Sequence, residues 1–281
     1  MDVPFARPSL TEADGAAVAA AVASGWVSQG PRVAAFEAAY AERVGAPDAV
    51  ATTNCTTALH LALYVSGVGP GDEVIVPSLS FIATANAVWQ CGATPVFADV
   101  DPLTYNLDPA SAEGAITERT KAIMPVHQVG LPADMDAFIA LADRYGLELV
   151  EDAACAIGAQ YKGRPIGSLG PLACFSLHPR KVITTGEGGM IAVHDPAVAA
   201  RLRTLRQHAM DLSDLARHGA KDIVFEGYPE RGVNKVPRRL ADTTLAKERL
   251  GFEAEIGLED GLRRLVEWWR AERATSSALA A

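Results

Sequence analysis

The sequence predicts an α/β fold built around a mostly parallel β-sheet with helices on both faces. Short apolar segments alternate along the chain with segments of helical length. The apolar segments read as strands that are buried on both faces. Regular alternation of such strands with helices is typical of βαβ units and of a doubly covered sheet.

The first two expected elements are helices. Thr11 and Asp14 have the pattern of an N-cap with an acidic first turn, which predicts a helix over Glu12–Ala23. A second helix is expected over Arg32–Val44, and a glycine follows each of the two.

The alternating part of the chain follows these helices. The strands are expected at Ala49–Thr52, Glu73–Val76, Thr94–Ala98, Lys121–Val126, Leu147–Val150, Leu172–Ser176 and Met190–Val193. The helices between them are expected at Thr56–Ser66, Ile82–Cys91, Pro109–Thr117 and Ala133–Tyr145. In such sheets ligands bind at the carboxyl ends of the strands, so chemistry is sought there.

Composition narrows the class of protein. The 281 residues are 49% hydrophobic and 21% charged, as in an ordinary globular chain. The net charge of −9 does not indicate a nucleic-acid-binding protein. No signal peptide and no membrane-spanning segment are expected. The four cysteines lack metal-type spacing, which favours reduced thiols, a cytoplasmic location and no bound metal.

Two polar features stand at predicted strand ends. Thr53–Thr57 directly precedes a helix, where backbone N–H groups and the helix dipole favour an anion, although a simple N-cap explains the same residues. Asp152, with Glu151 before it and small residues after it, leaves room for a flat ring whose pyridine nitrogen the carboxylate would keep protonated. A strand-end cap remains an equal alternative for this carboxylate.

Two further candidate site residues, Lys181 and Phe81, also follow predicted strands. Lys181 stands in a Gly/Thr-rich loop after the apolar strand that ends at Ser176, although most lysines are simply solvated. An amine of this kind forms a Schiff base with a bound aldehyde, and the Ser176 hydroxyl is a candidate phosphate ligand. Phe81 follows another strand and is a candidate to stack on a ring, although a core position is the commoner role of an aromatic residue.

Four segments together resemble the DegT/DnrJ/EryC1/StrS family of pyridoxal 5′-phosphate (PLP)-dependent sugar aminotransferases. They are Gly69–Val74, Phe81–Ala87, Glu151–Ala154 and His178–Gly189, and the resemblance runs from about residue 5 to 234. It implies the aspartate-aminotransferase-like fold, known as PLP fold type I, for a large domain over residues 1–234.

The resemblance also implies roles for individual residues. Lys181 would hold PLP as a Schiff base, Asp152 would pair with the pyridinium nitrogen, and Phe81 would stack on the ring. The residues implied to bind the cofactor phosphate are Thr56, Thr57, Ser176 and, toward the neighbouring subunit of a homodimer, Asn234. Cys155 stands where relatives often have Gln or His, and a thiol is a weaker hydrogen-bonding group at that contact with the cofactor oxygen.

The chain departs from the family pattern after Asn234. Residues 235–271 resemble the C-terminal end of nucleotide-sugar epimerases and dehydratases, which predicts a short helical tail in place of the usual small domain, followed by a disordered end over 272–281. No Gly-x-Gly-x-x-Gly fingerprint follows a strand, so an epimerase activity of the chain itself is not expected. A fusion near Val233–Val236 is the hypothesis for this junction.

The implied function is transamination of a nucleotide-linked keto sugar in amino-sugar biosynthesis. L-glutamate is the amino donor that the resemblance implies, and no nucleic acid or membrane partner is expected. The alternative is a non-catalytic PLP-binding homologue that acts as a regulatory or assembly partner, because a missing small domain would leave the sugar site incomplete.

Overall fold

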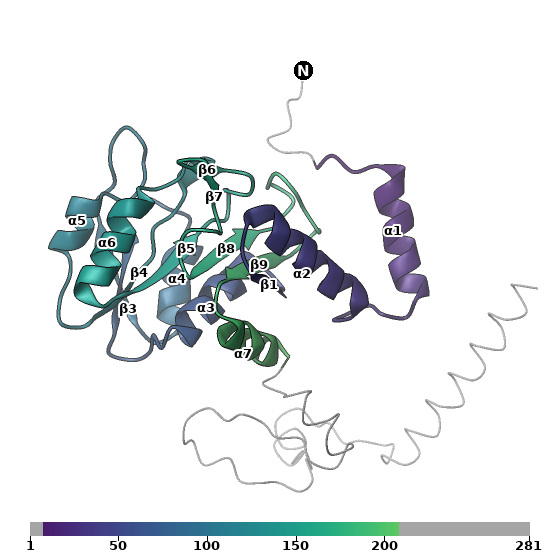
Figure 1. Cartoon of the computed structure of the whole chain (residues 1–281), viewed down its shortest axis with the longest axis horizontal. Helices are drawn as coiled ribbons and strands as arrows, with labels where there is room; N and C mark the ends of the chain where they lie inside the picture. The colour runs from purple at the N-terminus through teal and green to yellow at the C-terminus, as the bar shows by residue number, and fades with distance from the viewer. Residues whose placement is uncertain (1–7, 208–281) are drawn as a thin grey trace, which may run out of the picture. The chain divides into compact units, whose positions relative to one another are not determined.

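A computed structural model describes residues 8–207 of the chain, and the arrangement of their elements is drawn in Figure 1. The helices in this range are α1 (Glu12–Ala23), α2 (Pro31–Val44), α3 (Cys55–Val65), α4 (Ala83–Gln90), α5 (Pro109–Gly114), the 3₁₀ turn η1 (Gln128–Gly130), α6 (Met135–Tyr145) and α7 (Pro196–Arg206). The strands are β1 (Asp48–Thr52), β2 (Glu73–Pro77), β3 (Thr94–Ala98), β4 (Thr120–Ile123), β5 (Glu148–Asp152), β6 (Gln160–Tyr161), β7 (Arg164–Pro165), β8 (Leu172–Ser176) and β9 (Gly189–Val193).

Seven strands form one sheet in the order β1-β9-β8-β5-β4-β2-β3. The pairs β2·β3, β2·β4, β4·β5 and β5·β8 are parallel, while β9 runs antiparallel to both of its neighbours. The expected mostly parallel sheet is therefore confirmed. The reversal of β9 was not expected, because an apolar strand looks the same in sequence whichever way it runs.

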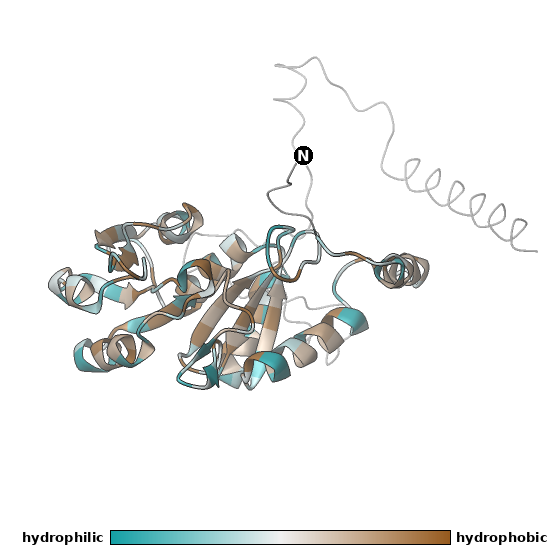
Figure 2. Ribbon diagram, turned by 90° about the horizontal axis from the view of Figure 1, so that it is seen from above, coloured by the Kyte–Doolittle hydropathy of each residue, from teal (hydrophilic) through white to brown (hydrophobic). Residues whose placement is uncertain are grey.

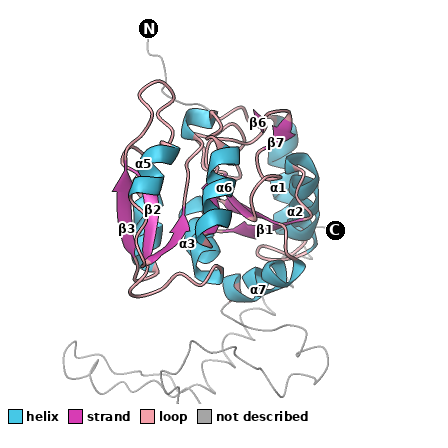
Figure 3. Ribbon diagram, turned by 60° about the vertical axis from the view of Figure 1, so that its left-hand side comes forward, coloured by secondary structure: helices cyan, strands magenta, loops and turns pink. Residues whose placement is uncertain are grey.

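Helices cover both faces of this sheet (Figure 3). Buried side chains of α3, α4 and α7 form one core cluster with the sheet, and those of α2, α5 and α6 contribute to two clusters of other strand residues. In β5, Leu149 and Val150 belong to different clusters, because successive strand side chains point to opposite faces. Figure 2 shows the central strands coloured mainly toward the hydrophobic end of the scale.

Element ends differ from the expected ones where local hydrogen bonds decide them. The helix expected over Pro109–Thr117 ends at Gly114, since the Thr117 N–H donates to the Thr120 hydroxyl at 2.8 Å and so belongs to the turn into β4. The strand expected to reach Val126 ends at Ile123, beyond which Val126 makes only an isolated bridge with Asp152. The strand expected to stop at Val150 continues through Asp152.

Four elements were not expected: the 3₁₀ turn η1, the strands β6 and β7, and helix α7. The hairpin β6·β7 is two residues long on each side, which is too short for a periodic pattern. Helix α7 has Asp195 as its N-cap, with the side chain accepting from the Ala197 N–H at 2.7 Å, and Pro196 at its first position.

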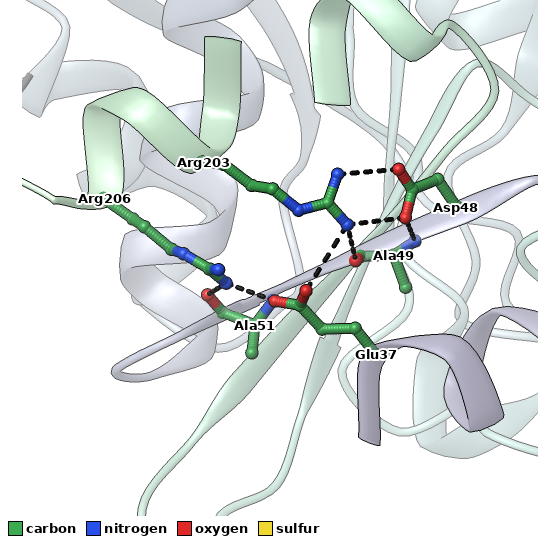
Figure 4. A network of polar contacts seen from close by, with 6 residues as sticks. All are labelled: Glu37, Asp48, Ala49, Ala51, Arg203 and Arg206. Atoms are coloured by element: carbon green, nitrogen blue, oxygen red, sulfur yellow. Dashed lines mark hydrogen bonds and ion pairs between the residues drawn. The ribbon is translucent and has the colours of Figure 1, made fainter. Parts of the chain in front are cut away.

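Helix α7 fastens the outer edge of β1 through two arginines (Figure 4). The Arg206 guanidinium donates to the Ala51 carbonyl at 2.9 Å and to Glu37, whose carboxylate accepts from the Ala51 N–H at 2.8 Å. Arg203 makes two 2.7 Å contacts with Asp48 and donates to the Ala49 carbonyl at 3.1 Å. These side chains satisfy polar backbone groups that an edge strand otherwise leaves open.

Several expectations lie outside the described residues. These are Asn234, the domain boundary near residue 234, the helical tail over 235–271 and the end over 272–281. Within residues 8–207, no helix combines the length and the apolar character needed to cross a bilayer.

Candidate functional site

The candidate site lies where the carboxyl ends of β1, β8 and β5 meet the start of β9. Asp152 of β5 is in register with Cys174 of β8. Two residues further along β8, Ser176 is in register with Gly189, and Gly189 is in register with Thr52 of β1. The sheet therefore gathers residues that are more than a hundred positions apart in the chain along one edge.

The N-terminus of α3 lies at this edge. Asn54 caps the helix, its side chain accepting from the Thr57 N–H at 2.8 Å. A Cβ atom on Gly189 would lie 2.5 Å from the carbonyl carbon of Asn54, so only glycine allows β9 to start this close to the helix. The first N–H groups of a helix have no intrahelical acceptor, so those of Cys55 and Thr56 are available to an anion.

The Asp152 carboxylate is buried beneath this edge, with 4% of the residue exposed. One oxygen accepts from the Thr84 hydroxyl at 2.8 Å, and the other accepts from the Ala154 N–H at 3.2 Å. Burial raises the pKa of Asp152, while these two hydrogen bonds and the charge of Lys181 oppose the rise. The carboxylate is thus held in one orientation by donors that favour its ionised form.

Lys181 reaches the same place from the loop between β8 and β9. Its Nζ donates to Cys155 Sγ at 3.0 Å, and Cys155 lies three residues after Asp152. The loop is held by the Lys181 N–H, which donates to the His178 carbonyl at 2.8 Å, and by the Thr184 hydroxyl, which donates to the Leu177 carbonyl at 2.8 Å. Lys181 and Cys155 are both half-buried, so the amine remains reachable from solvent.

Phe81 lies just before α4, one turn ahead of the threonine that contacts Asp152. The Thr84 N–H donates to the Phe81 carbonyl at 3.1 Å, and 74% of Phe81 is exposed. Because the ring is exposed, it is free to stack on a planar group. The alternative of a core position for Phe81 is therefore wrong.

Most of the expected site residues lie at this one edge. Lys181 contacts Cys155, which lies three residues after Asp152, and the charge of Lys181 acts on the Asp152 carboxylate. Ser176 lies along the same edge as the α3 N-terminus that carries Thr56 and Thr57. Asn234 lies outside the described residues.

Sequence reasoning missed three residues near Asp152. Thr84 and Ser80 form a hydroxyl chain to its carboxylate, and His127 pairs with the buried side chain of Glu151 beside it. Thr84 stands three positions after Phe81, one turn along a helix start, and this spacing is the signal that was available. His127 carried no signal, because its contact with Glu151 depends on the pairing of β4 with β5.

The donor set fits PLP, the cofactor implied by the resemblance. Lys181 offers an amine for the aldehyde, Asp152 a buried carboxylate for the ring nitrogen, and the α3 N-terminus with Ser176 offers N–H and hydroxyl donors for the phosphate. These groups come from separate strands and meet on one edge. Such a site on this seven-stranded sheet defines the large domain of a fold type I PLP enzyme.

More particularly, the chain belongs to the DegT/DnrJ/EryC1/StrS aminotransferase family, whose model matches residues 8–230. GDP-perosamine synthase of Caulobacter vibrioides is 55% identical over 187 residues, which are 66% of this chain and 50% of that protein. Spore coat polysaccharide biosynthesis protein SpsC of Bacillus subtilis is 45% identical over 218 residues, covering 78% of this chain and 56% of SpsC.

Solved structures agree with the family. S. venezuelae DesV, in complex with a ketimine intermediate, has a TM-score of 0.68 and 48% identity, with 69% of this chain and 53% of DesV covered. DesI, in the presence of its TDP-sugar product, has a TM-score of 0.71 and 39% identity, with 76% and 55% covered. The chain spans about half the length of the curated relatives that it matches.

Proposed function

We propose that this chain is a PLP-dependent aminotransferase that moves an amino group from L-glutamate to a keto sugar carried on a nucleotide. The observation that carries the proposal is the meeting of Lys181 and Asp152 at one edge of the sheet, beside the N-terminus of α3. Relatives named as a GDP-perosamine synthase and as an enzyme with a TDP-sugar product support a nucleotide-linked sugar as the substrate class.

When bound, PLP supplies an aldehyde and an electron-withdrawing ring. Lys181 would hold the aldehyde, and its free amine would carry a proton between the donor α-carbon and the cofactor C4′. The Asp152 carboxylate would keep the ring nitrogen protonated, which makes the ring a better electron sink. Phe81 would stack on the ring, and the α3 N-terminus, Thr56, Thr57 and Ser176 would anchor the phosphate.

Cys155 has a distinct place in this proposal. Its thiol is the group that contacts the Lys181 amine in the structure, at 3.0 Å. At the position where relatives often have an amide or an imidazole, the thiol gives the cofactor oxygen only a weak hydrogen-bonding partner. The non-covalent hold on the cofactor would therefore rest mainly on Asp152 and on the phosphate anchors.

Homodimer formation and a cytoplasmic location belong to the same proposal. Phe81 and Ile82, next to the site, are 74% and 65% exposed, which supports a neighbouring subunit that covers this edge. All four cysteines are free thiols, as expected in a reducing compartment.

The test is a spectroscopic titration of the purified chain. PLP is added, the visible absorption band of the lysine adduct is recorded, and L-glutamate is then added, followed by a panel of nucleotide-linked keto sugars. Loss of the band on adding glutamate and its return on adding a keto sugar are the expected results. Lys162→Ala, which removes an exposed lysine, is the matched control for Lys181→Ala.

Three outcomes would contradict parts of the proposal. A band that persists in Lys181→Ala would exclude the assigned lysine. A band that ignores every amino donor would favour the non-catalytic homologue. A band that responds to glutamate and to no keto sugar would contradict the sugar substrate.

A further inference from the structure

A chain of two hydroxyl groups leads to the carboxylate of Asp152. Thr84, in the first turn of α4, places its Oγ1 2.8 Å from Asp152 Oδ2, and Ser80 Oγ lies 2.8 Å from the same Thr84 oxygen. Thr84 is buried, with 1% exposed, and Ser80 is half-buried. These three groups connect the turn after β2 to the end of β5.

The direction of the two hydrogen bonds follows from counting protons. An ionised carboxylate only accepts, so Thr84 donates its single hydroxyl proton to Asp152, and Ser80 must then donate to Thr84. Because the Ala154 N–H can only donate, its hydrogen bond to the other Asp152 oxygen favours the ionised carboxylate. In that state Thr84 gives the carboxylate a second donor, and Ser80 fixes the direction of the Thr84 hydroxyl.

Asp152 needs this support because it is buried. Desolvation is the largest influence on its pKa and raises it, and the Thr84 hydrogen bond is the largest of the influences that lower it. The ionisable groups that act on or are acted on by Asp152 are Lys181, His127, Cys55 and Cys174. Without Thr84, the carboxylate would keep only the Ala154 N–H and the charge of Lys181 as influences that favour its ionised form.

Among the described contacts, the Thr84 hydroxyl makes no hydrogen bond to a backbone group of its own helix. Buried threonines commonly bond to a nearby backbone group, as Thr120 does by accepting from the Thr117 N–H at 2.8 Å. The Thr84 hydroxyl bonds only to side chains, and one of these lies 68 positions away in the chain. The orientation of this hydroxyl is therefore explained by its bond to Asp152 and not by a role in capping α4.

We propose that Thr84, backed by Ser80, is a positioning residue that aims the Asp152 carboxylate and keeps it ionised toward the cofactor ring. The proposal rests on the proposed function for the identity of the ring. Thr84 acts through Asp152 and touches no reacting atom. The hydroxyl chain also ties the carboxylate to the turn that carries Phe81, so the group that would pair with the ring nitrogen and the group that would stack on the ring are held by the same segment.

The experiment compares the full-length wild-type chain with Thr84→Val, Thr84→Ser, Ser80→Ala and Thr120→Val. Valine matches threonine in shape and removes the hydroxyl, serine restores it, and Thr120→Val removes a buried threonine hydroxyl away from the site. In the cofactor-free chain, the Asp152 carboxyl is titrated by isotope-edited spectroscopy, with Asp152→Asn identifying its signal. In the PLP-loaded chain, the protonation of a nitrogen-15-labelled ring is measured together with the rate of the L-glutamate half-reaction.

The proposal predicts a higher apparent pKa of Asp152 in Thr84→Val, with a smaller rise in Ser80→Ala and recovery in Thr84→Ser. It also predicts less protonated ring nitrogen in Thr84→Val and a half-reaction about tenfold slower, as expected for loss of one hydrogen bond to a charged group. The proposal would be overturned if Thr84→Val kept the wild-type pKa of Asp152 and the wild-type protonation of the ring nitrogen. In that case the variant would show only a loss of stability, as Thr120→Val does. Failure of the wild-type chain to bind PLP would refute the proposed function, while the cofactor-free titration still decides the role of Thr84.

Discussion

The imidazole of His127 donates from Nε2 to a carboxylate oxygen of Glu151 at 2.9 Å, and both side chains are fully buried. The tautomer follows from the other ring nitrogen, which accepts from the Ala133 N–H at 3.0 Å and therefore carries no proton. The second Glu151 oxygen accepts from the Gly170 N–H at 2.9 Å. This pair joins the segment after β4 to the end of β5, where the His127 N–H also donates to the Asp152 carbonyl.

Replacing Glu151 with glutamine should destabilise the fold despite the matched shape. Two N–H donors face the two carboxylate oxygens, and an amide offers only one acceptor oxygen, so one buried donor loses its partner. We expect a loss of about 1–3 kcal/mol in the free energy of unfolding, measured by urea denaturation. Glu113→Gln, at a partly exposed ion pair with Arg144, is the control and should change little. Equal stability of the two variants would contradict the assigned tautomer.

Asp152→Asn should stabilise the cofactor-free chain and slow the reaction. Burial raises the pKa of Asp152 above its ordinary 3.8, so ionising it costs stability, fully so above the raised pKa and not at all below the ordinary one. The variant should therefore be more stable than wild type at neutral pH, with the difference fading as the pH falls. Asparagine still accepts from the Ala154 N–H and donates to Thr84.

In contrast to stability, the activity of Asp152→Asn should fall. Loss of the carboxylate should slow the L-glutamate half-reaction about 100-fold or more, because a preorganised charge at the ring is removed. Denaturation curves at several pH values and stopped-flow absorbance are the two measurements. An Asp152→Asn chain that is less stable at neutral pH, or that keeps wild-type rates, would contradict the role given to this carboxylate.

Gly189→Ala should weaken PLP binding. The added Cβ would lie 2.5 Å from backbone atoms of Asn54 and from the Thr52 hydroxyl, so β9 and the α3 N-terminus must move apart. We expect a loss of about 1–3 kcal/mol in stability and a clear rise in the PLP dissociation constant, measured by fluorescence titration. Gly15→Ala, where the new Cβ meets nothing within 4 Å in α1, is the control. Wild-type affinity in Gly189→Ala would show that the α3 N-terminus does not anchor the phosphate.

Arg206→Ala should be costly although the residue is far from the chemistry. It removes a donor from the Ala51 carbonyl and leaves the buried Glu37 carboxylate with fewer partners. Breaking such a buried pair costs about 3 kcal/mol, seen as a lower urea midpoint. Lys162→Ala breaks an ion pair whose side chains are 66% and 63% exposed and should cost under about 1 kcal/mol. A similar small loss in both variants would show that the contacts of Arg206 with β1 and Glu37 contribute little to stability.

The sheet and much of the site could be predicted because their signals are local. Apolar segments bounded by glycine and polar residues located all seven strands of the main sheet, and the strand-end rule directed attention to Asp152 and Lys181. The helix start at Thr53–Thr57 was equally visible, since Asn54 and the following threonines form a recognisable capping sequence.

The remainder depends on contacts between distant segments. The reversed direction of β9 follows from its pairing with β1 and β8, and no residue in Gly189–Val193 encodes it. The hydrogen bond from Arg206 to the Ala51 carbonyl joins positions 155 residues apart, and the bond from Thr84 to Asp152 joins positions 68 residues apart. No sequence periodicity reveals contacts over such separations. Helix α7 itself had a capping aspartate and a first-turn proline, and these signals were present in the sequence.

The central claim is that Lys181 is the amine that holds PLP, and chemical trapping tests it most directly. The PLP-loaded chain is reduced with sodium borohydride, digested, and mapped by mass spectrometry. We predict a pyridoxyl group on Lys181 alone, full labelling in Lys162→Ala, and none in Lys181→Ala. A label on any other lysine, or its absence from Lys181 in a chain that binds PLP, would contradict the account.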